Sequence, residues 1–237
     1  MDGVALLDRM DRKYLFAAAQ LPDVLLSLQS DYRVLDIKNV RSSRYESLYF
    51  DKPDFELYYA HHRGRVNRYK VRYRRYVDSD IVFIEVKLKN QHGRTIKTRM
   101  SCDAIEKKIR DGAAMFVNAH TPFIAEELEP KLWVHYERIT LVCKSGIERV
   151  TLDRKLSFKN ATHEKSITNA VIAEVKKSNR DKSLFANVMR DRHIREERMS
   201  KYCFGIGTLY PVKHNNFNLK FRHINQLTHE HPLTSAA

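Results

Sequence analysis

The chain has 237 residues, and its 43 lysines and arginines exceed its 29 aspartates and glutamates, which gives a formal net charge of +14. This excess favours an anionic partner: a phosphate chain, a nucleic acid or an acidic membrane surface. The hydrophobic fraction of 43% is enough to bury a core, so we expect a compact globular protein.

The three cysteines are widely spaced and form no C-x-x-C pair, which argues against a disulfide framework and against a zinc site. No apolar run approaches the roughly 20 residues of a membrane-spanning helix, and the N-terminus lacks the pattern of a secretion signal. We therefore expect a soluble, cytoplasmic protein. No linker-like stretch divides the chain, which predicts one domain over residues 1–228 and a loose tail over residues 229–237.

The first half of the chain predicts a helix followed by hairpins. A helix is expected over residues 22–30. From residue 44 to residue 99 the sequence alternates with the two-residue period of strands, and turn residues at 62–64, 78–80 and 90–93 divide it into a meander. Asp103 followed by Glu106 resembles a capping box, which predicts a helix over residues 103–111, and a second short helix is expected over residues 123–129.

The second half predicts strands over residues 132–143, 147–153 and 171–177. Apolar residues at 184, 185, 188 and 189 recur at helical spacing, and another helix is expected near the C-terminus. Gly205-Ile206-Gly207 lacks the strand and the third glycine of a dinucleotide-binding loop, so we predict a turn there. His61-His62 has no metal-ligand spacing, which favours a structural role.

The most informative feature is the pattern of charge on the predicted strands. In residues 67–76, Arg68, Lys70, Arg72 and Arg74 fall on one face of the strand, and Tyr69, Val71 and Tyr73 fall on the other. The next strands repeat this division, with Glu85, Lys87 and Lys89, then Lys97 and Arg99, then Glu174 and Lys176 on the polar face.

A solvated sheet face is the ordinary explanation of one such strand. Several of them gather like charges that repel one another unless an anion neutralises them. If the sheet closes with its charged face inward, the interior becomes a basic tunnel and helices cover the apolar outer face. We therefore predict an α+β fold, a closed antiparallel β-barrel with helices packed around the outside.

The carboxylates among these cations need their own explanation. A divalent cation prefers carboxylate and phosphate oxygens, so Glu85, Glu174 and Asp11 are candidate ligands of Mg²⁺ or Mn²⁺ that bridges to phosphate. The alternative is that these acids are internal salt-bridge partners of the lysines and arginines.

Taken in order, several short motifs resemble the VTC domain of polyphosphate polymerases, within the CYTH-like triphosphate tunnel proteins. They are Asp11-Arg12-Lys13-Tyr14-Leu15, Ser47-Leu48-Tyr49-Phe50-Asp51, Arg68-x-Lys70-x-Arg72-x-Arg74-x-Tyr76, Glu85-Val86-Lys87, Lys97-x-Arg99, Tyr136-x-Arg138, Arg149-Val150-Thr151-Leu152-Asp153, Glu174-Val175-Lys176 and Ser200-Lys201-Tyr202-Cys203. The resemblance spans most of the chain. It departs from the family at Asp11, where a glutamate is usual, and the acid-rich first strand of the adenylyl cyclase and thiamine triphosphatase relatives is reduced to Arg9-x-Asp11-x-Lys13.

The resemblance implies a tunnel that binds triphosphate or polyphosphate with the help of Mn²⁺ or Mg²⁺, and an activity that moves the γ-phosphoryl group of ATP onto a polyphosphate chain. It assigns the central role to Lys13, Arg72, Arg74, Lys87, Arg138 and Lys176, with Glu174 and Glu85 nearest the metal. The other cations expected to bind phosphate are Arg68, Lys70, Lys89, Lys97, Arg99 and Arg149. A metal-dependent triphosphatase, and a non-catalytic module that binds polyphosphate or nucleic acid, stay open as alternatives.

Overall fold

The computed structural model describes residues 9–146, 148–178 and 183–229. Its helices are α1 (Leu21–Leu28), α2 (Glu56–His62), α3 (Asp111–His120), α4 (Leu184–Asp191), α5 (Lys201–Leu209) and α6 (Asn218–His229). Its strands are β1 (Arg9–Ala17), β2 (Tyr32–Val34), β3 (Ser42–Asp51), β4 (Arg68–Tyr76), β5 (Ile81–Lys89), β6 (Thr95–Cys102), β7 (Glu129–Cys143), β8 (Glu148–Lys159), β9 (Glu164–Ile167) and β10 (Ala170–Ser178).

The strands of the described residues form one 10-stranded sheet in the order β1-β10-β8-β7-β3-β4-β5-β6, with β2 also paired to β7 and β9 to β8. All of its ladders are antiparallel. The neighbours β3, β4, β5 and β6 follow one another along the chain, which confirms the predicted meander. The 62–64 turn of that prediction lies where α2 ends, between β3 and β4.

The sheet curls, but the predicted closed barrel is wrong in one respect, because no ladder of the described residues joins β1 to β6. The free edge of β1 is met instead by an irregular segment, residues 196–200. The Glu197 amide donates to the Lys13 carbonyl at 2.8 Å, and on the far side the Lys70 ammonium donates to the Ser200 hydroxyl at 2.8 Å. This segment therefore links the edge of β1 to the inner face of β4, while no described ladder joins the edge strands β1 and β6.

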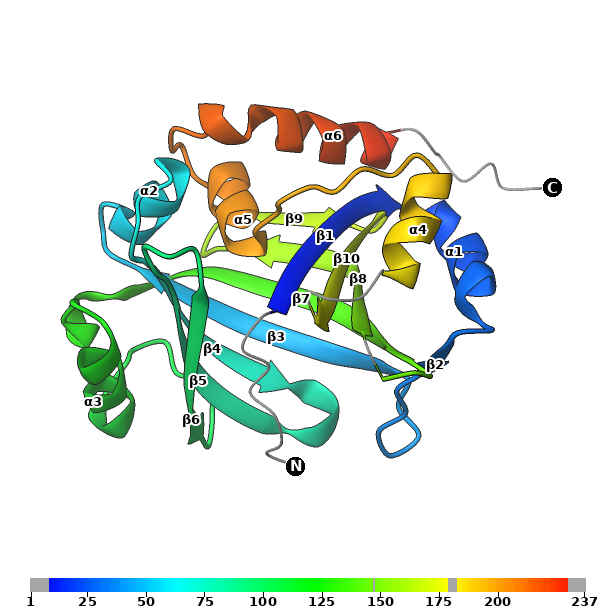
Figure 1. Cartoon of the computed structure of the whole chain (residues 1–237). Coiled ribbons are helices and arrows are strands. Elements are labelled where there is room, and N and C mark those ends of the chain that lie inside the picture. The colour runs from blue at the N-terminus through cyan, green and yellow to red at the C-terminus, as the bar shows by residue number, and fades with distance from the viewer. Residues whose placement is uncertain (1–8, 147, 179–182, 230–237) are drawn as a thin grey trace.

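Two helical layers cover the outer face of the sheet (Figure 1). The helix α3 packs against the apolar side of β3, β4 and β5, where Val71 and Tyr73 are fully buried. The helices α1 and α4 contact each other and cover β1, β8 and β10. The alternation in the sequence thus buries the apolar face outside and leaves the polar face inside, as predicted.

The helix α5 packs on the opposite, inner face, beside α6 (Figure 1). The predicted turn at residues 205–207 is wrong, since both glycines lie within α5. Glycine is needed in this helix because α5 lies very close to the sheet: a Cβ atom on Gly205 would lie 2.5 Å from Leu132 Cδ2 and 2.7 Å from Phe158 Cδ1. The apolar cluster around α5 fills one part of the interior and leaves the remainder to charged residues.

Other elements differ from the sequence predictions in detail. The helix expected over residues 103–111 is absent from this described segment, and α3 begins at Asp111 instead, because its buried stripe is Ala113, Ala114 and Val117. The short helix expected over residues 123–129 is a single 3-10 turn over Ala125–Glu127. The predictions for α1, α4 and a C-terminal helix are confirmed, and β8 extends six residues beyond the predicted end at residue 153. No helix in the described ranges is long and apolar enough to cross a bilayer.

Candidate functional site

The inner face of the sheet carries the charged residues because strand register places them there. In β4 and β5, Lys70 pairs with Lys87, and Lys87 pairs in turn with Lys97 of β6. In the other half of the sheet, Asp11 pairs with Lys176 and Lys13 with Glu174. Register and alternation thus bring all the predicted site residues to this one face: Asp11, Lys13, Arg68, Lys70, Arg72, Arg74, Glu85, Lys87, Lys89, Lys97, Arg99, Arg138, Arg149, Glu174 and Lys176.

The curl of the sheet brings its two halves together across the interior. The charge of Arg72 and burial lower the pKa of Lys87 on β5, and Glu174 on β10 opposes this lowering. Burial lowers the pKa of Lys89 on β5, and the charge of Lys13 on β1 adds to this lowering, although many strands separate β1 and β10 from β5 along the sheet. Charges on strands that are far apart in the sheet order affect each other's pKa only when they are close in space. The inner face is therefore a concave, positively charged surface with walls on two sides.

One group of charges on this face is internally compensated. Both Arg72 and Lys97 contact the fully buried carboxylate of Glu85, at 2.6 and 2.5 Å, and the Tyr49 hydroxyl accepts a hydrogen bond from Arg72 at 2.5 Å. Burial raises the pKa of Glu85, but the charges of Arg72, Arg74 and Lys97 outweigh it and hold that pKa far below its usual range. Glu85 therefore acts as a salt-bridge partner that orients Arg72, and it has no oxygen free of cations for a metal.

A second compensated group lies where β7, β8 and α5 meet. Arg138 donates two hydrogen bonds to Asp153, at 2.5 and 2.8 Å, and Lys201 binds the same carboxylate. Tyr136 lies under this group, with its ring centroid 4.8 Å from the Lys201 ammonium and 5.3 Å from the Arg138 guanidinium. The sequence prediction omitted Asp153 and Lys201 from the site, although both stand in the motifs that carry the family resemblance.

Two cations of the inner face have little or no compensation. The Arg74 guanidinium is 8% exposed and makes one long hydrogen bond, 3.3 Å to the Ser47 hydroxyl. In the described part of the chain, Lys87 makes no hydrogen bond or ion pair, and the charge of Arg72, together with burial, lowers the pKa of Lys87 well below its usual range. Arg74 is buried and Lys87 is half-buried. Desolvated cations without carboxylate partners are costly to the free protein, so these two positions are where an anion would be held most strongly.

Polar groups without partners lie beside these cations. The Tyr136 and Thr151 hydroxyls are buried and have no hydrogen-bond partner among the described residues. Unpaired buried hydroxyls are rare in native structures, and each can donate to an anion or a water molecule. Both residues stand on the inner face, in line with Tyr45 and Glu174 of the neighbouring strands.

The acids available to a metal are fewer than predicted. Asp11 and Glu174 stand diagonally across β1 and β10. Desolvation raises the pKa of Asp11, the charge of Lys176 opposes it, and the negative charge of Glu174 raises it further. Burial raises the pKa of Glu174, but Lys13 and Lys176 bring it down to about 2, so this carboxylate stays ionised. No group of three or more metal-ligating side chains occurs in the described ranges. Glu174 is paired with Lys176 at 3.4 Å and with Lys13 at 3.9 Å, contacts that are longer than the 2.5 and 2.6 Å contacts of Glu85. Two carboxylates suit Mg²⁺ or Mn²⁺ when phosphate oxygens and water complete the shell, so Asp11 and the loosely paired Glu174 fit a metal that arrives with the anion.

The histidine pair has the structural role that the sequence predicts. The His61 ring nitrogen Nε2 lies 3.0 Å from the Tyr69 carbonyl oxygen. Burial and then the charge of Lys70 lower the pKa of His61 to about 2, which keeps the ring neutral. The cysteines of the described chain are free thiols.

Comparison with solved structures supports the architecture. The chain is similar to a putative adenylyl cyclase from Hippeastrum described as having a dominant triphosphatase activity (TM-score 0.56, 13% identity, 87% of this chain and 100% of that one). It is also similar to a putative adenylate cyclase from Bacillus halodurans (TM-score 0.55, 13% identity, 86% and 97%). The PH1819 protein from Pyrococcus horikoshii is comparable (TM-score 0.50, 12% identity, 84% and 99%). At 12–13% sequence identity, these similarities show a shared fold and nothing about activity.

Comparison with curated protein sequences gives no match. The VTC domain, by contrast, matches residues 8–210, which spans β1 to the end of α5 and so includes every residue of the charged inner face. The chain with this basic, curled sheet therefore belongs to the VTC domain family.

Proposed function

We propose that this protein binds a polyphosphate chain along the inner face of the sheet and transfers the γ-phosphoryl group of ATP to the end of that chain. The observation that carries the proposal is the excess of cations on this face, with Arg74 and Lys87 lacking carboxylate partners. A polyanion would neutralise charges that the protein itself leaves uncompensated.

The extent of the charged surface favours a chain over a single phosphate. Residues 68 to 74 of β4 present a cation at every second position. At about 3.3 Å per strand residue, this row extends over roughly 20 Å. Such a length exceeds one phosphate group and suits several phosphoryl groups in succession.

The site residues would act by position and charge. Phosphoryl transfer needs alignment of the attacking and leaving oxygens and stabilisation of the transferring group, and no protein nucleophile. Arg72 is held in place by Glu85, and Arg138 by Asp153, so both guanidinium groups are oriented before the anion arrives. Asp11 and Glu174 would hold the divalent metal, which neutralises phosphate charge when it is bound.

A triphosphatase that releases orthophosphate is the second candidate. The Hippeastrum protein with the similar fold is described as having a dominant triphosphatase activity.

Phosphorus NMR of the protein incubated with ATP and Mn²⁺ tests these alternatives. Signals from internal phosphates of a polymer, absent with Arg74→Ala and present with Arg75→Ala, are the expected result. Arg75 is the matched control because it is the next residue of β4 and its guanidinium binds Asp80 on the outside. Orthophosphate alone would replace the polymerase by the triphosphatase, and intact ATP would refute both enzymatic functions under these conditions.

A further inference from the structure

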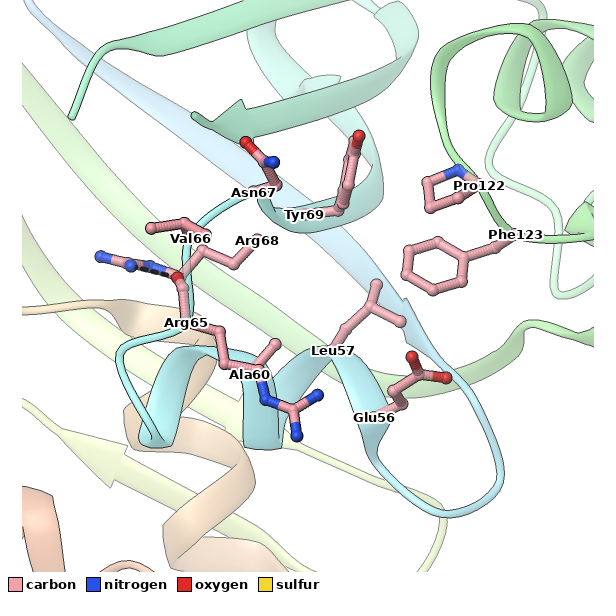
Figure 2. Close-up of a pocket in the computed structure, with 10 residues that line it drawn as sticks. All are labelled: Glu56, Leu57, Ala60, Arg65, Val66, Asn67, Arg68, Tyr69, Pro122 and Phe123. Atoms are coloured by element: carbon pink, nitrogen blue, oxygen red, sulfur yellow. Dashed lines mark hydrogen bonds between the residues drawn. The ribbon is translucent and has the colours of Figure 1, made fainter. Parts of the chain in front are cut away.

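The pocket of interest lies at the start of β4, on the side of the strand that faces away from the charged interior. It encloses about 180 Å³ between α2, the loop that leads into β4 and the segment that follows α3. Figure 2 shows Tyr69 and Phe123 approaching it from two sides, with Leu57 between them. The two rings are 5.7 Å apart and nearly perpendicular, and both side chains are half-buried, so each ring leaves part of its surface open.

The pocket has polar groups at its rim as well as aromatic walls. The Asn67 side-chain oxygen accepts a hydrogen bond from the Gln91 amide at 3.1 Å, which fixes the side chain, and the Asn67 amide nitrogen has no partner within the described part of the chain. The Glu56 carboxylate, also at the rim, binds Lys52 at 2.9 Å and keeps accepting capacity. Aromatic walls with donors and acceptors at the edge suit a flat heteroaromatic ring better than an aliphatic chain.

Arg68 connects this pocket with the charged face. It lines the pocket, where its guanidinium donates to the Arg65 carbonyl at 2.6 Å (Figure 2). It also begins the row of cations on β4 and pairs in register with Lys89. An occupant of the pocket thus lies next to the end of the row of phosphate-binding cations.

From this arrangement we infer that the pocket binds the base of a nucleoside triphosphate whose phosphates lie on the inner face of the sheet. The ribose would cross the rim formed by residues 65–67, and Arg68 would meet the first phosphate. This inference rests on the proposed function, because it takes the inner face as the site of the phosphates.

Binding measured by calorimetry with two probes, ATP and inorganic tripolyphosphate, tests the inference. The variant Phe123→Leu keeps apolar volume but removes the flat ring, and Phe116→Leu on α3 is the matched control, since Phe116 is half-buried and outside the pocket. Base stacking on an aromatic ring supports a loss of about five-fold or more in ATP affinity for Phe123→Leu. Tripolyphosphate affinity should stay unchanged in both variants.

A second variant fills the pocket without removing a wall. Ala60 lines the pocket from α2, and Ala60→Phe should weaken ATP binding while tripolyphosphate binds as before. Unchanged ATP affinity in both Phe123→Leu and Ala60→Phe would overturn the inference. So would an equal loss for both probes, which would mean that the pocket holds phosphate and not a base. Failure of the inner face itself is distinguished by Arg74→Ala, which must weaken both probes if the proposed function is correct.

Discussion

Replacement of Arg74 by alanine tests whether this cation binds a ligand or stabilises the fold. The guanidinium is 8% exposed, has one 3.3 Å hydrogen bond to Ser47, and lies over the Tyr45 ring at 5.5 Å. If it binds phosphate, its loss removes one charge-assisted interaction worth about 1.5–3 kcal/mol. Because every 1.4 kcal/mol is tenfold in affinity, tripolyphosphate should bind about 10- to 150-fold more weakly.

The adjacent Arg75 gives the control for this measurement. Its side chain is 41% exposed and pairs with Asp80 at 2.7 Å on the outer face. Exposed pairs contribute about 0–1 kcal/mol, so Arg75→Ala should leave the tripolyphosphate affinity within a few-fold. Calorimetric titration at fixed salt is the assay, since salt screens both charges.

Thermal unfolding of the free variants completes the test. Arg74 makes one long hydrogen bond and lies over the Tyr45 and Tyr136 rings at 5.5 and 6.0 Å, and it forms no ion pair with a described carboxylate, so Arg74→Ala should unfold within a few degrees of the unmodified protein. A variant with a raised unfolding temperature and unchanged tripolyphosphate affinity would refute the reasoning, because Arg74 would then be a strained cation that binds no ligand.

Three further predictions concern protonation, metal and packing. Since the pKa of Lys87 is lowered in the free protein, a bound polyanion should raise it, so binding should take up protons between the free and bound pKa values of Lys87 and weaken as pH rises through that range. Calorimetry in buffers of different ionisation enthalpy should show that Lys87→Met loses that uptake. Glu174→Gln should weaken Mn²⁺ binding, measured by electron paramagnetic resonance with tripolyphosphate present, and the variant should bind tripolyphosphate without metal at least as tightly as the unmodified protein. An unchanged Mn²⁺ affinity would show that Glu174 is not a metal ligand. Gly205→Ala should lower the free energy of unfolding by about 1–3 kcal/mol and the unfolding temperature by several degrees. Gly112→Ala, whose added Cβ has no atom within 4 Å, should leave the unfolding temperature unchanged or raise it. Equal effects of the two substitutions would contradict the packing argument.

Local sequence pattern predicted the charged face because a strand has a fixed side-chain period. Once Arg72 is assigned to one face, Lys70 and Arg74 must share it. The register then aligns Arg72 with Glu85 and Lys70 with Lys87. The meander β3 to β6 was predictable for the same reason, since consecutive hairpins need only local information.

The parts that the sequence could not predict depend on contacts between distant residues. Lys201 and Asp153 are 48 positions apart, and only the packing of α5 on the inner face brings them together. The same packing makes Gly205 helical, although glycine by itself favours a turn. The segment over residues 196–200 has no strand pattern, so its contacts with β1 and with Lys70 of β4 could not be read from periodicity.

The pairing of charges on the inner face divides its residues by role. Arg72 and Arg138 are each fixed by a buried carboxylate, and removal of Glu85 or Asp153 would leave an unpaired buried guanidinium, which destabilises the fold. Arg74 and Lys87 lack such partners, so the fold does not need their charge and the free protein bears the cost of keeping it. Charge that is costly to the free protein and unnecessary for its packing is consistent with selection for a bound anion. The compensated cations would therefore give the site its shape, and the uncompensated ones would supply most of its affinity.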